Sequence, residues 1–131
     1  MEKKIVQIPG VTDTPSPNNV PLSAVVKAGD FLFVSGMPPK DHTTGKMIKG
    51  DIEVQTRQVL ENLKMVLEAS GSSLDKVVKT TVFCVNAAHF RAVNDIYRQY
   101  FPNDPPARSF VTVGSWPASF DIEIECVAIA S

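Results

Sequence analysis

The feature that most constrains the fold of this chain is its small amount of helix. Only two segments have the three-and-four spacing of an amphipathic helix, whereas several short segments have the alternating or β-branched pattern of strands. Two helices cover only one face of a sheet with that many strands. The strand segments Phe31–Val34 and Val127–Ile129 are nevertheless apolar on both faces. We therefore expect part of the second face to meet another subunit.

Capping residues mark the two helical segments. Asp51 is placed to cap the first segment, Ile52–Ser70, and Gly71 closes it. Asn86 is expected to cap the second segment, which runs to Tyr100. The predicted buried stripes consist of Ile52, Val59, Leu60, Leu63, Val66 and Leu67 in the first helix, and of Phe90, Val93, Tyr97 and Phe101 in the second.

The strand pattern recurs along the rest of the chain. Predicted strands are Lys4–Ile8, Leu22–Lys27, Phe31–Ser35, Val77–Val85, Arg108–Val113 and Asp121–Ile129. Alternation assigns Val78, Thr80, Val82 and Cys84 to one face of the fourth strand. A Gly-Asp turn joins the second and third strands in a hairpin, and loops are expected from Pro9 to Val20 and from Lys40 to Gly50. This order predicts an α+β fold with a mixed sheet and two βαβ-like halves, in a single domain over residues 1–131.

Composition excludes several classes of protein. With 44% hydrophobic and 21% charged residues, the 131-residue chain can bury a core. A net charge of −1 without a basic run argues against nucleic acid as a partner. Neither a membrane span nor an export signal is apparent, so a cytoplasmic location is predicted. Cys84 and Cys126 are expected to be packed, reduced thiols. His42 and His89 alone cannot form a metal site, and no cofactor motif is present.

Charged residues within the strands are the best candidates for chemistry. Arg108 opens a strand, and Glu123 and Glu125 lie in the apolar last strand, where alternation places them on the same face. The arginine is expected one strand away. One interpretation is a cross-strand ion pair on a solvated face. The other is a site in which the guanidinium holds a substrate carboxylate bidentately while a glutamate transfers protons or orients water.

Six segments together resemble the RidA/YjgF family of imine and enamine deaminases. They are VKAGDFLFVSG (26–36), QTRQVLENL (55–63), VKTTVF (78–83), AVNDIY (92–97), PARS (106–109) and IEIE (122–125), and they extend over most of the chain in the family's order. The resemblance implies a chorismate-mutase-like α+β fold, in which two helices lie on one face of a mixed sheet. It also implies a homotrimer whose three active sites lie between subunits.

The resemblance also implies roles for individual residues. Arg108 matches the arginine that grips the substrate carboxylate, and Glu123 matches the acidic residue associated with the attacking water. Ser35 and Gly36 match a pocket-lining Ser-Gly pair, and Asn94 matches an asparagine near the pocket. The implied reaction is hydrolysis of 2-imino or 2-enamino acids of the 2-aminoacrylate type, such as 2-iminopropanoate and 2-iminobutanoate, to 2-oxo acids and ammonia. It needs no cofactor, because imines already hydrolyse in water and positioning with one proton-transfer group suffices.

The chain departs from the best-known members of the family at several pocket positions. Leu22 replaces a tyrosine, Met37 a glutamine and Phe110 a cysteine, while Trp116 replaces a smaller aliphatic residue. If alternation holds, Phe110 shares the face of Arg108 and reshapes the pocket.

These departures leave other functions open. One is a 2-aminomuconate-type deaminase, acting on longer unsaturated substrates in aromatic catabolism. Another is a non-catalytic trimer that binds small carboxylates or a partner protein. RNA cleavage, an activity attributed to members under the endoribonuclease label, is least supported because no cluster of basic residues interleaves with aromatic ones.

Overall fold

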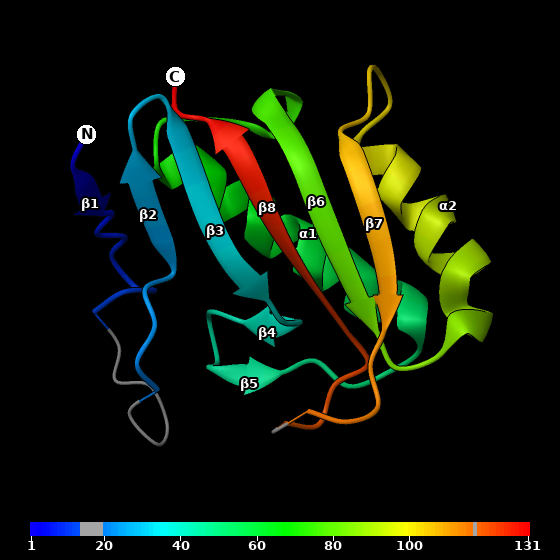
Figure 1. The fold of residues 1–131 in the computed structure, drawn as a ribbon. Helices are drawn as coiled ribbons and strands as arrows, with labels where there is room; N and C mark the ends of the chain where they lie inside the picture. Colours follow the sequence, from blue (N-terminus) through cyan, green and yellow to red (C-terminus); the bar gives the residue numbers. More distant parts are fainter. Residues whose placement is uncertain (14–19, 117) are drawn as a thin grey trace.

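The structure is a computed structural model that describes residues 1–13, 20–116 and 118–131. Its sheet has six strands, and both α-helices lie behind it in the view of Figure 1. The elements are β1 (Lys3–Ile5), β2 (Val25–Ala28), β3 (Phe31–Met37), β4 (Lys40–Asp41), β5 (Lys46–Met47), α1 (Ile52–Ala69), the 3-10 turn η2 (Leu74–Lys76), β6 (Val77–Cys84), the 3-10 turn η3 (Ala87–His89), α2 (Phe90–Tyr100), β7 (Ala107–Thr112) and β8 (Ile122–Ile129).

The sheet topology confirms the predicted mixed α+β fold. Strands follow the order β1-β2-β3-β8-β6-β7, in which β6 and β7 are parallel and every other pair is antiparallel. Because β3 and β6 are both antiparallel to β8, they run in the same direction. The helices α1 and α2 are therefore the crossovers of two βαβ units, from β3 to β6 and from β6 to β7.

The core lies between the sheet and the two helices. All six predicted stripe residues of α1 are buried, and so are Val93, Tyr97 and Phe101 in and after α2. Phe90 was predicted to be buried with them, and this was wrong, since 44% of its surface is exposed. Phe90 is exposed because it is the first residue of α2 and packs over Phe110 of β7, which is an edge strand of the sheet.

The ends of several elements differ from the predictions. The first strand ends at Ile5, because the carbonyl of Ile8 instead closes a turn by accepting from the N–H groups of Val11 and Thr12. The next strand starts at Val25 rather than Leu22. Part of the predicted loop, residues 14–19, lies outside the described residues.

Two irregularities in the central strands also differ from strict alternation. β3 continues past Ser35 to Met37, with a bulge between Val34 and Met37. In β6 a register shift between Val77 and Lys79 buries Val77 and exposes Val78, reversing the predicted faces at that end. The predicted loop 40–50 also contains the β4–β5 ribbon.

The caps agree with the sequence in position, with one difference of detail. Asp51 Oδ1 accepts from Val54 N (3.0 Å) at the start of α1, as predicted. Asn86 Oδ1 accepts from Ala88 N (2.9 Å), so it caps the 3-10 turn η3 that precedes α2 rather than α2 itself. Both cysteines are free and buried, as expected. Among the described residues, no helix is long and apolar enough to cross a membrane.

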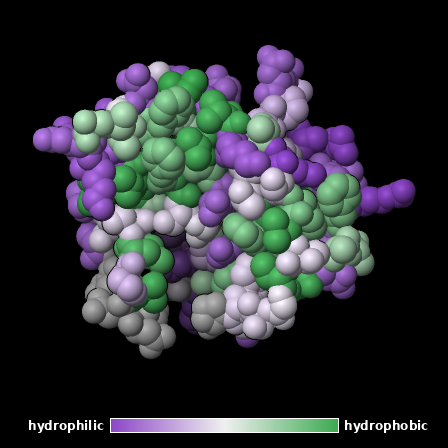
Figure 2. Space-filling view, viewed as in Figure 1, coloured by the Kyte–Doolittle hydropathy of each residue, from purple (hydrophilic) through white to green (hydrophobic). Residues whose placement is uncertain are grey.

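The face of the sheet opposite the helices is partly apolar. Phe31, Phe33 and Ile129 are 44%, 48% and 40% exposed there, while their neighbours Leu32 and Ala128 point into the core. Figure 2, which views this face, shows hydrophobic residues gathered over β2, β3 and the end of β8. The predicted two-faced apolar strands are thus confirmed. This face is called the helix-free face below.

Candidate functional site

Arg108 is a residue of β7, and three residues of α2 hold its guanidinium. Its Nη1 donates to Asn94 Oδ1 (2.8 Å), and its guanidinium carbon lies 4.9 Å from the centre of the Tyr97 ring and 5.5 Å from that of Phe90. Phe90, Asn94 and Tyr97 are spaced i, i+4, i+7, which places them on one stripe of the helix. Tyr97 is fixed in turn by a 2.8 Å hydrogen bond between its hydroxyl and Thr80 Oγ1. The guanidinium is therefore preorganised.

Phe110 lies beside this group. Arg108 pairs with Thr80 and Phe110 pairs with Val82, and both partners are buried beneath the helices. Phe110 therefore shares the face of Arg108, as predicted. Its ring meets that of Phe90 edge-on, with the centres 5.0 Å apart and an interplanar angle of 78°.

Glu123 lies on the helix-free face, against Gly36. A Cβ added at Gly36 would lie 2.8 Å from the carboxyl carbon of Glu123, closer than real Cβ atoms come. The absence of a side chain at Gly36 is thus what leaves room for the carboxylate. The preceding Ser35 is anchored, because its Oγ donates to Ser23 O (2.6 Å) and its N–H donates to Ala24 O (2.9 Å).

The environment of Glu123 favours its protonated form. Burial of the carboxyl is the main reason that the pKa of Glu123 lies above its usual value, and repulsion from the Glu125 carboxylate raises this pKa further. Glu125 is on the same face two residues along β8 and is exposed. The predicted sharing of one face by the two carboxylates is confirmed.

Within one chain Arg108 and Glu123 do not meet. β6 lies between their strands, and the pairs Thr80–Arg108 and Phe83–Glu123 place them on opposite faces of the sheet. The prediction that the arginine lies one strand from the carboxylates was therefore wrong within one chain, and the interpretation as a cross-strand ion pair is excluded. Across the parts of the chain that the structure describes, the one salt bridge is Arg98–Asp95 (3.7 Å).

The candidate residues thus form two groups. The arginine group consists of Arg108, Asn94, Phe110, Phe90 and Tyr97. The glutamate group consists of Glu123, Gly36 and, one residue before Gly36, Ser35. Sequence reasoning missed Phe90 and Tyr97 as neighbours of the arginine by assigning them to the core. Their i, i+4, i+7 spacing with Asn94 was the available signal.

A hydrogen-bonded clamp that the sequence analysis also missed holds the start of β8. The buried Gln55 of α1 donates through Nε2 to Asp121 Oδ2 (2.8 Å) and to Gly50 O (3.0 Å), and its Oε1 accepts from Asp121 N (2.8 Å). Asp121 precedes Glu123 by two residues. The signal for this clamp was a glutamine on the buried, mostly apolar face of α1.

The family model described as Endoribonuclease L-PSP matches residues 13–130 of the chain. The chain belongs to the RidA/YjgF family. It is 48% identical over 108 residues to a RutC family protein of Pyrococcus horikoshii, with 82% of this chain and 86% of the relative covered. It is 44% identical over 108 residues to the chloroplastic Reactive Intermediate Deaminase A of Arabidopsis thaliana, with 82% of this chain and 58% of the relative covered. The solved structure of Escherichia coli TdcF with bound serine superposes with a TM-score of 0.84 at 31% identity, covering 98% of this chain and 99% of that one.

The four departures from well-known RidA/YjgF members differ in where their side chains lie. Leu22 is 64% exposed in the segment before β2. Met37 is buried and pairs with Ile124, so it points into the core. Trp116 stacks on Phe120 and donates through Nε1 to the carbonyl of that residue (2.6 Å). Phe110 is the departure that belongs to the arginine group, where its ring contacts that of Phe90.

Proposed function

We propose that this RidA/YjgF family member is a hydrolytic deaminase of reactive 2-imino and 2-enamino acids of the 2-aminoacrylate type, producing 2-oxo acids and ammonia. The observation that carries the proposal is the guanidinium of Arg108. It is held by Asn94 and two aromatic rings, yet pairs with no carboxylate among the described residues. Such a guanidinium offers a preorganised, bidentate site for a substrate carboxylate.

The active form in this proposal is a homotrimer with sites between subunits. Arg108 and Glu123 are on opposite faces of one sheet, so a site containing both requires two chains. The exposed Phe31, Phe33 and Ile129 lie on the same face as Glu123, and their burial against a neighbour would stabilise the assembly. The glutamate group of one subunit then faces the arginine group of the next.

The mechanism assigns one task to each group. Arg108 binds the carboxylate and so positions the imine carbon, while Glu123 of the neighbouring subunit takes a proton from the attacking water. In the protonated imine the oxygen of that water bonds to the imine carbon, and the electron pair of the C=N double bond moves to the nitrogen, which gives a neutral carbinolamine. Glu123 passes its proton to this nitrogen and then takes the proton of the carbinolamine hydroxyl, so that the C=O bond forms as the C–N bond breaks and ammonia leaves. An enamine substrate first becomes the imine by taking up a proton at its β-carbon.

The comparisons support a small-molecule role over RNA cleavage. One relative is named Reactive Intermediate Deaminase A, and a solved relative carries bound serine, an amino acid with a carboxylate of its own. The family description also names an endoribonuclease. With a net charge of −1, this chain has no excess of positive charge to attract a phosphate backbone.

The test measures imine lifetime. An amino acid oxidase generates the imine in the presence of semicarbazide, and an active deaminase lowers the yield of semicarbazone. We expect the native protein to lower the yield and Arg108→Ala to lose at least about a hundredfold in kcat/KM, because the carboxylate loses its partner. Arg91→Ala, which removes an exposed arginine of α2, is the matched control and keeps native activity. Equal rates for native protein and Arg108→Ala contradict the proposal, and binding without turnover identifies a non-catalytic carboxylate-binding protein.

A further inference from the structure

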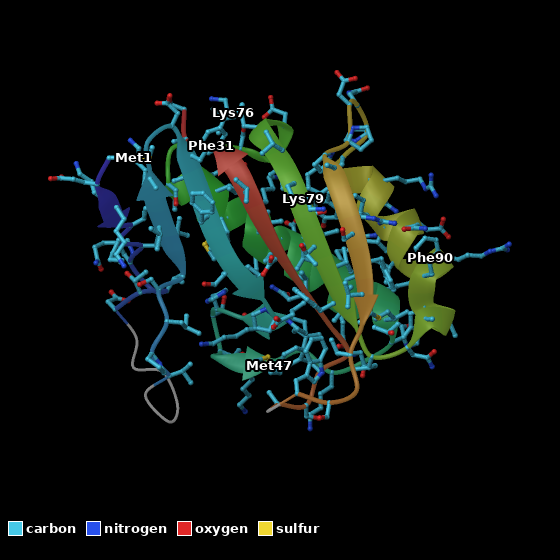
Figure 3. All side chains as sticks on the ribbon, in the orientation of Figure 1. Met1, Phe31, Met47, Lys76, Lys79 and Phe90 are labelled. Atoms are coloured by element: carbon cyan, nitrogen blue, oxygen red, sulfur yellow. The ribbon has the colours of Figure 1, made fainter. Side chains whose placement is uncertain are left out.

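Phe90 and Phe110 form an aromatic wall beside the guanidinium of Arg108. Their rings are in edge-to-face contact, with the ring centres 5.0 Å apart. Phe90 lies in the first turn of α2, and Phe110 lies in β7. Figure 3 places Phe90 at the α2 side of the molecule, away from Phe31 on β3. The wall is therefore separate from the apolar part of the helix-free face.

The two rings of this wall are exposed to solvent, although other residues of α2 already cover the core. Phe90 is 44% exposed and Phe110 is only partly buried, whereas the next inward residues of α2, Val93 and Tyr97, already close the core. Such rings bind apolar groups, since a group that covers them removes apolar surface from water. A surface with a cation at one end and apolar rings at the other suits a ligand with a carboxylate and an apolar side chain.

The spacing fits such a ligand. Arg108 and Phe110 are two residues apart on the same face of β7, which separates their Cα atoms by about 7 Å. In a 2-imino acid the side chain begins on the carbon bonded to the carboxylate, so a carboxylate bound to Arg108 brings the side chain within reach of the rings. A second carboxylate in that place would lose hydration without gaining a partner, which disfavours dicarboxylate substrates.

We propose that Phe110, together with Phe90, determines substrate specificity by binding the side chain, so that the protein prefers 2-imino acids with bulky apolar side chains over the short 2-aminoacrylate type. This inference rests on the proposed deaminase function. It ranks the substrates of that reaction, with imines such as those derived from leucine or phenylalanine hydrolysed faster than the short ones. Phe110 is the more informative of the two residues, because Phe90 also stacks on the Arg108 guanidinium.

The experiment compares kcat/KM for the leucine-derived and alanine-derived imines. We expect the native protein to prefer the leucine-derived imine by about tenfold or more, the range that a few methylene groups supply in an apolar pocket. Phe110→Ala is expected to bring this ratio close to one by reducing kcat/KM for the larger imine. Phe110→Leu, which keeps an apolar side chain and is less disruptive to folding, is expected to retain an intermediate ratio.

A core variant separates specificity from general damage. Val59→Ala removes buried volume from α1, an element that contains neither ring, so any general loss of activity should affect both rates equally and leave the ratio unchanged. A native preference for the alanine-derived imine, or a ratio that Phe110→Ala and Phe110→Leu leave unaltered, overturns the specificity inference alone. Failure of the native protein to hydrolyse any of the imines overturns the proposed function, and the inference with it.

Discussion

Two neighbouring residues, Gly36 and Glu125, determine the surroundings and the pKa of the Glu123 carboxyl. Its carboxyl lies in the space left by the missing side chain of Gly36, half-buried and close to the charge of Glu125. Both burial and this neighbour raise its pKa. A carboxyl whose pKa is moved toward neutrality both accepts and donates protons more effectively near neutral pH, which is what the proposed hydrolysis requires.

The pH dependence of activity follows from this raised pKa. The proposed base is ionised Glu123, so kcat/KM is expected to rise with pH through the pKa that burial and Glu125 raise above the ordinary glutamate value. Glu125→Gln removes the repulsion that disfavours ionisation, which lowers the pKa and shifts the acidic limb to lower pH. A pH profile of kcat/KM for the two proteins measures the shift. Identical acidic limbs in the two profiles would contradict the role assigned to Glu125.

The raised pKa of Glu123 also affects the stability of the fold. It lowers stability as the pH rises, whereas the proposed activity increases. A raised pKa in the folded state means that folding favours the protonated carboxyl. This contribution to stability is fully present below the ordinary glutamate pKa and is lost as the pH rises through the raised value. Above this raised pKa the ionised carboxylate of Glu123 thus works against folding.

At the scale of elements, α1 determines where β8 begins. Gln55 binds both the backbone N–H and the carboxylate of Asp121, and the N–H of Val85 donates to the carbonyl of the same residue (3.0 Å). Because β8 pairs with both β3 and β6, these contacts help to fix the register that places Glu123 opposite Phe83 and beside Gly36.

Loss of this clamp should be measurable as a loss of stability. Gln55→Ala leaves the N–H of Asp121 without its acceptor, and we expect a decrease in the free energy of unfolding of about 2 kcal/mol. Urea unfolding at a fixed protein concentration measures it. Gln99→Ala, at an exposed position of α2, is the control and should change this free energy by less than about 0.5 kcal/mol. Similar losses for both variants would show that the clamp contributes nothing specific.

At the scale of the whole molecule, one sheet separates the two groups of candidate residues. The arginine group faces α2 and the glutamate group faces away from both helices. A chain built in this way completes its proposed site only by association, so assembly and activity depend on each other.

Mixing two inactive variants tests this dependence. Arg108→Ala and Glu123→Gln are each expected to be inactive, but after subunit exchange some sites receive Arg108 from one chain and Glu123 from another. With equal amounts and random exchange, about a quarter of the sites are intact, so about a quarter of native activity should return. Imine hydrolysis before and after partial unfolding and refolding of the mixture measures the recovery. If the mixture stays inactive although native mass spectrometry shows trimers that contain both variants, the proposal of a site shared between subunits is wrong.

The sequence by itself determined the elements and most of the core. Periodicity and caps identified both helices, and alternation correctly put Glu123 with Glu125, and Arg108 with Phe110, because these patterns depend on local backbone geometry. Resemblance in six ordered segments identified the family.

Only the tertiary structure decided strand order, and with it the separation of Arg108 from Glu123 by β6 and by the two faces of the sheet. It also decided that Phe90 is exposed beside Arg108. Strand order and edge positions depend on contacts between residues far apart in sequence, which no local pattern encodes.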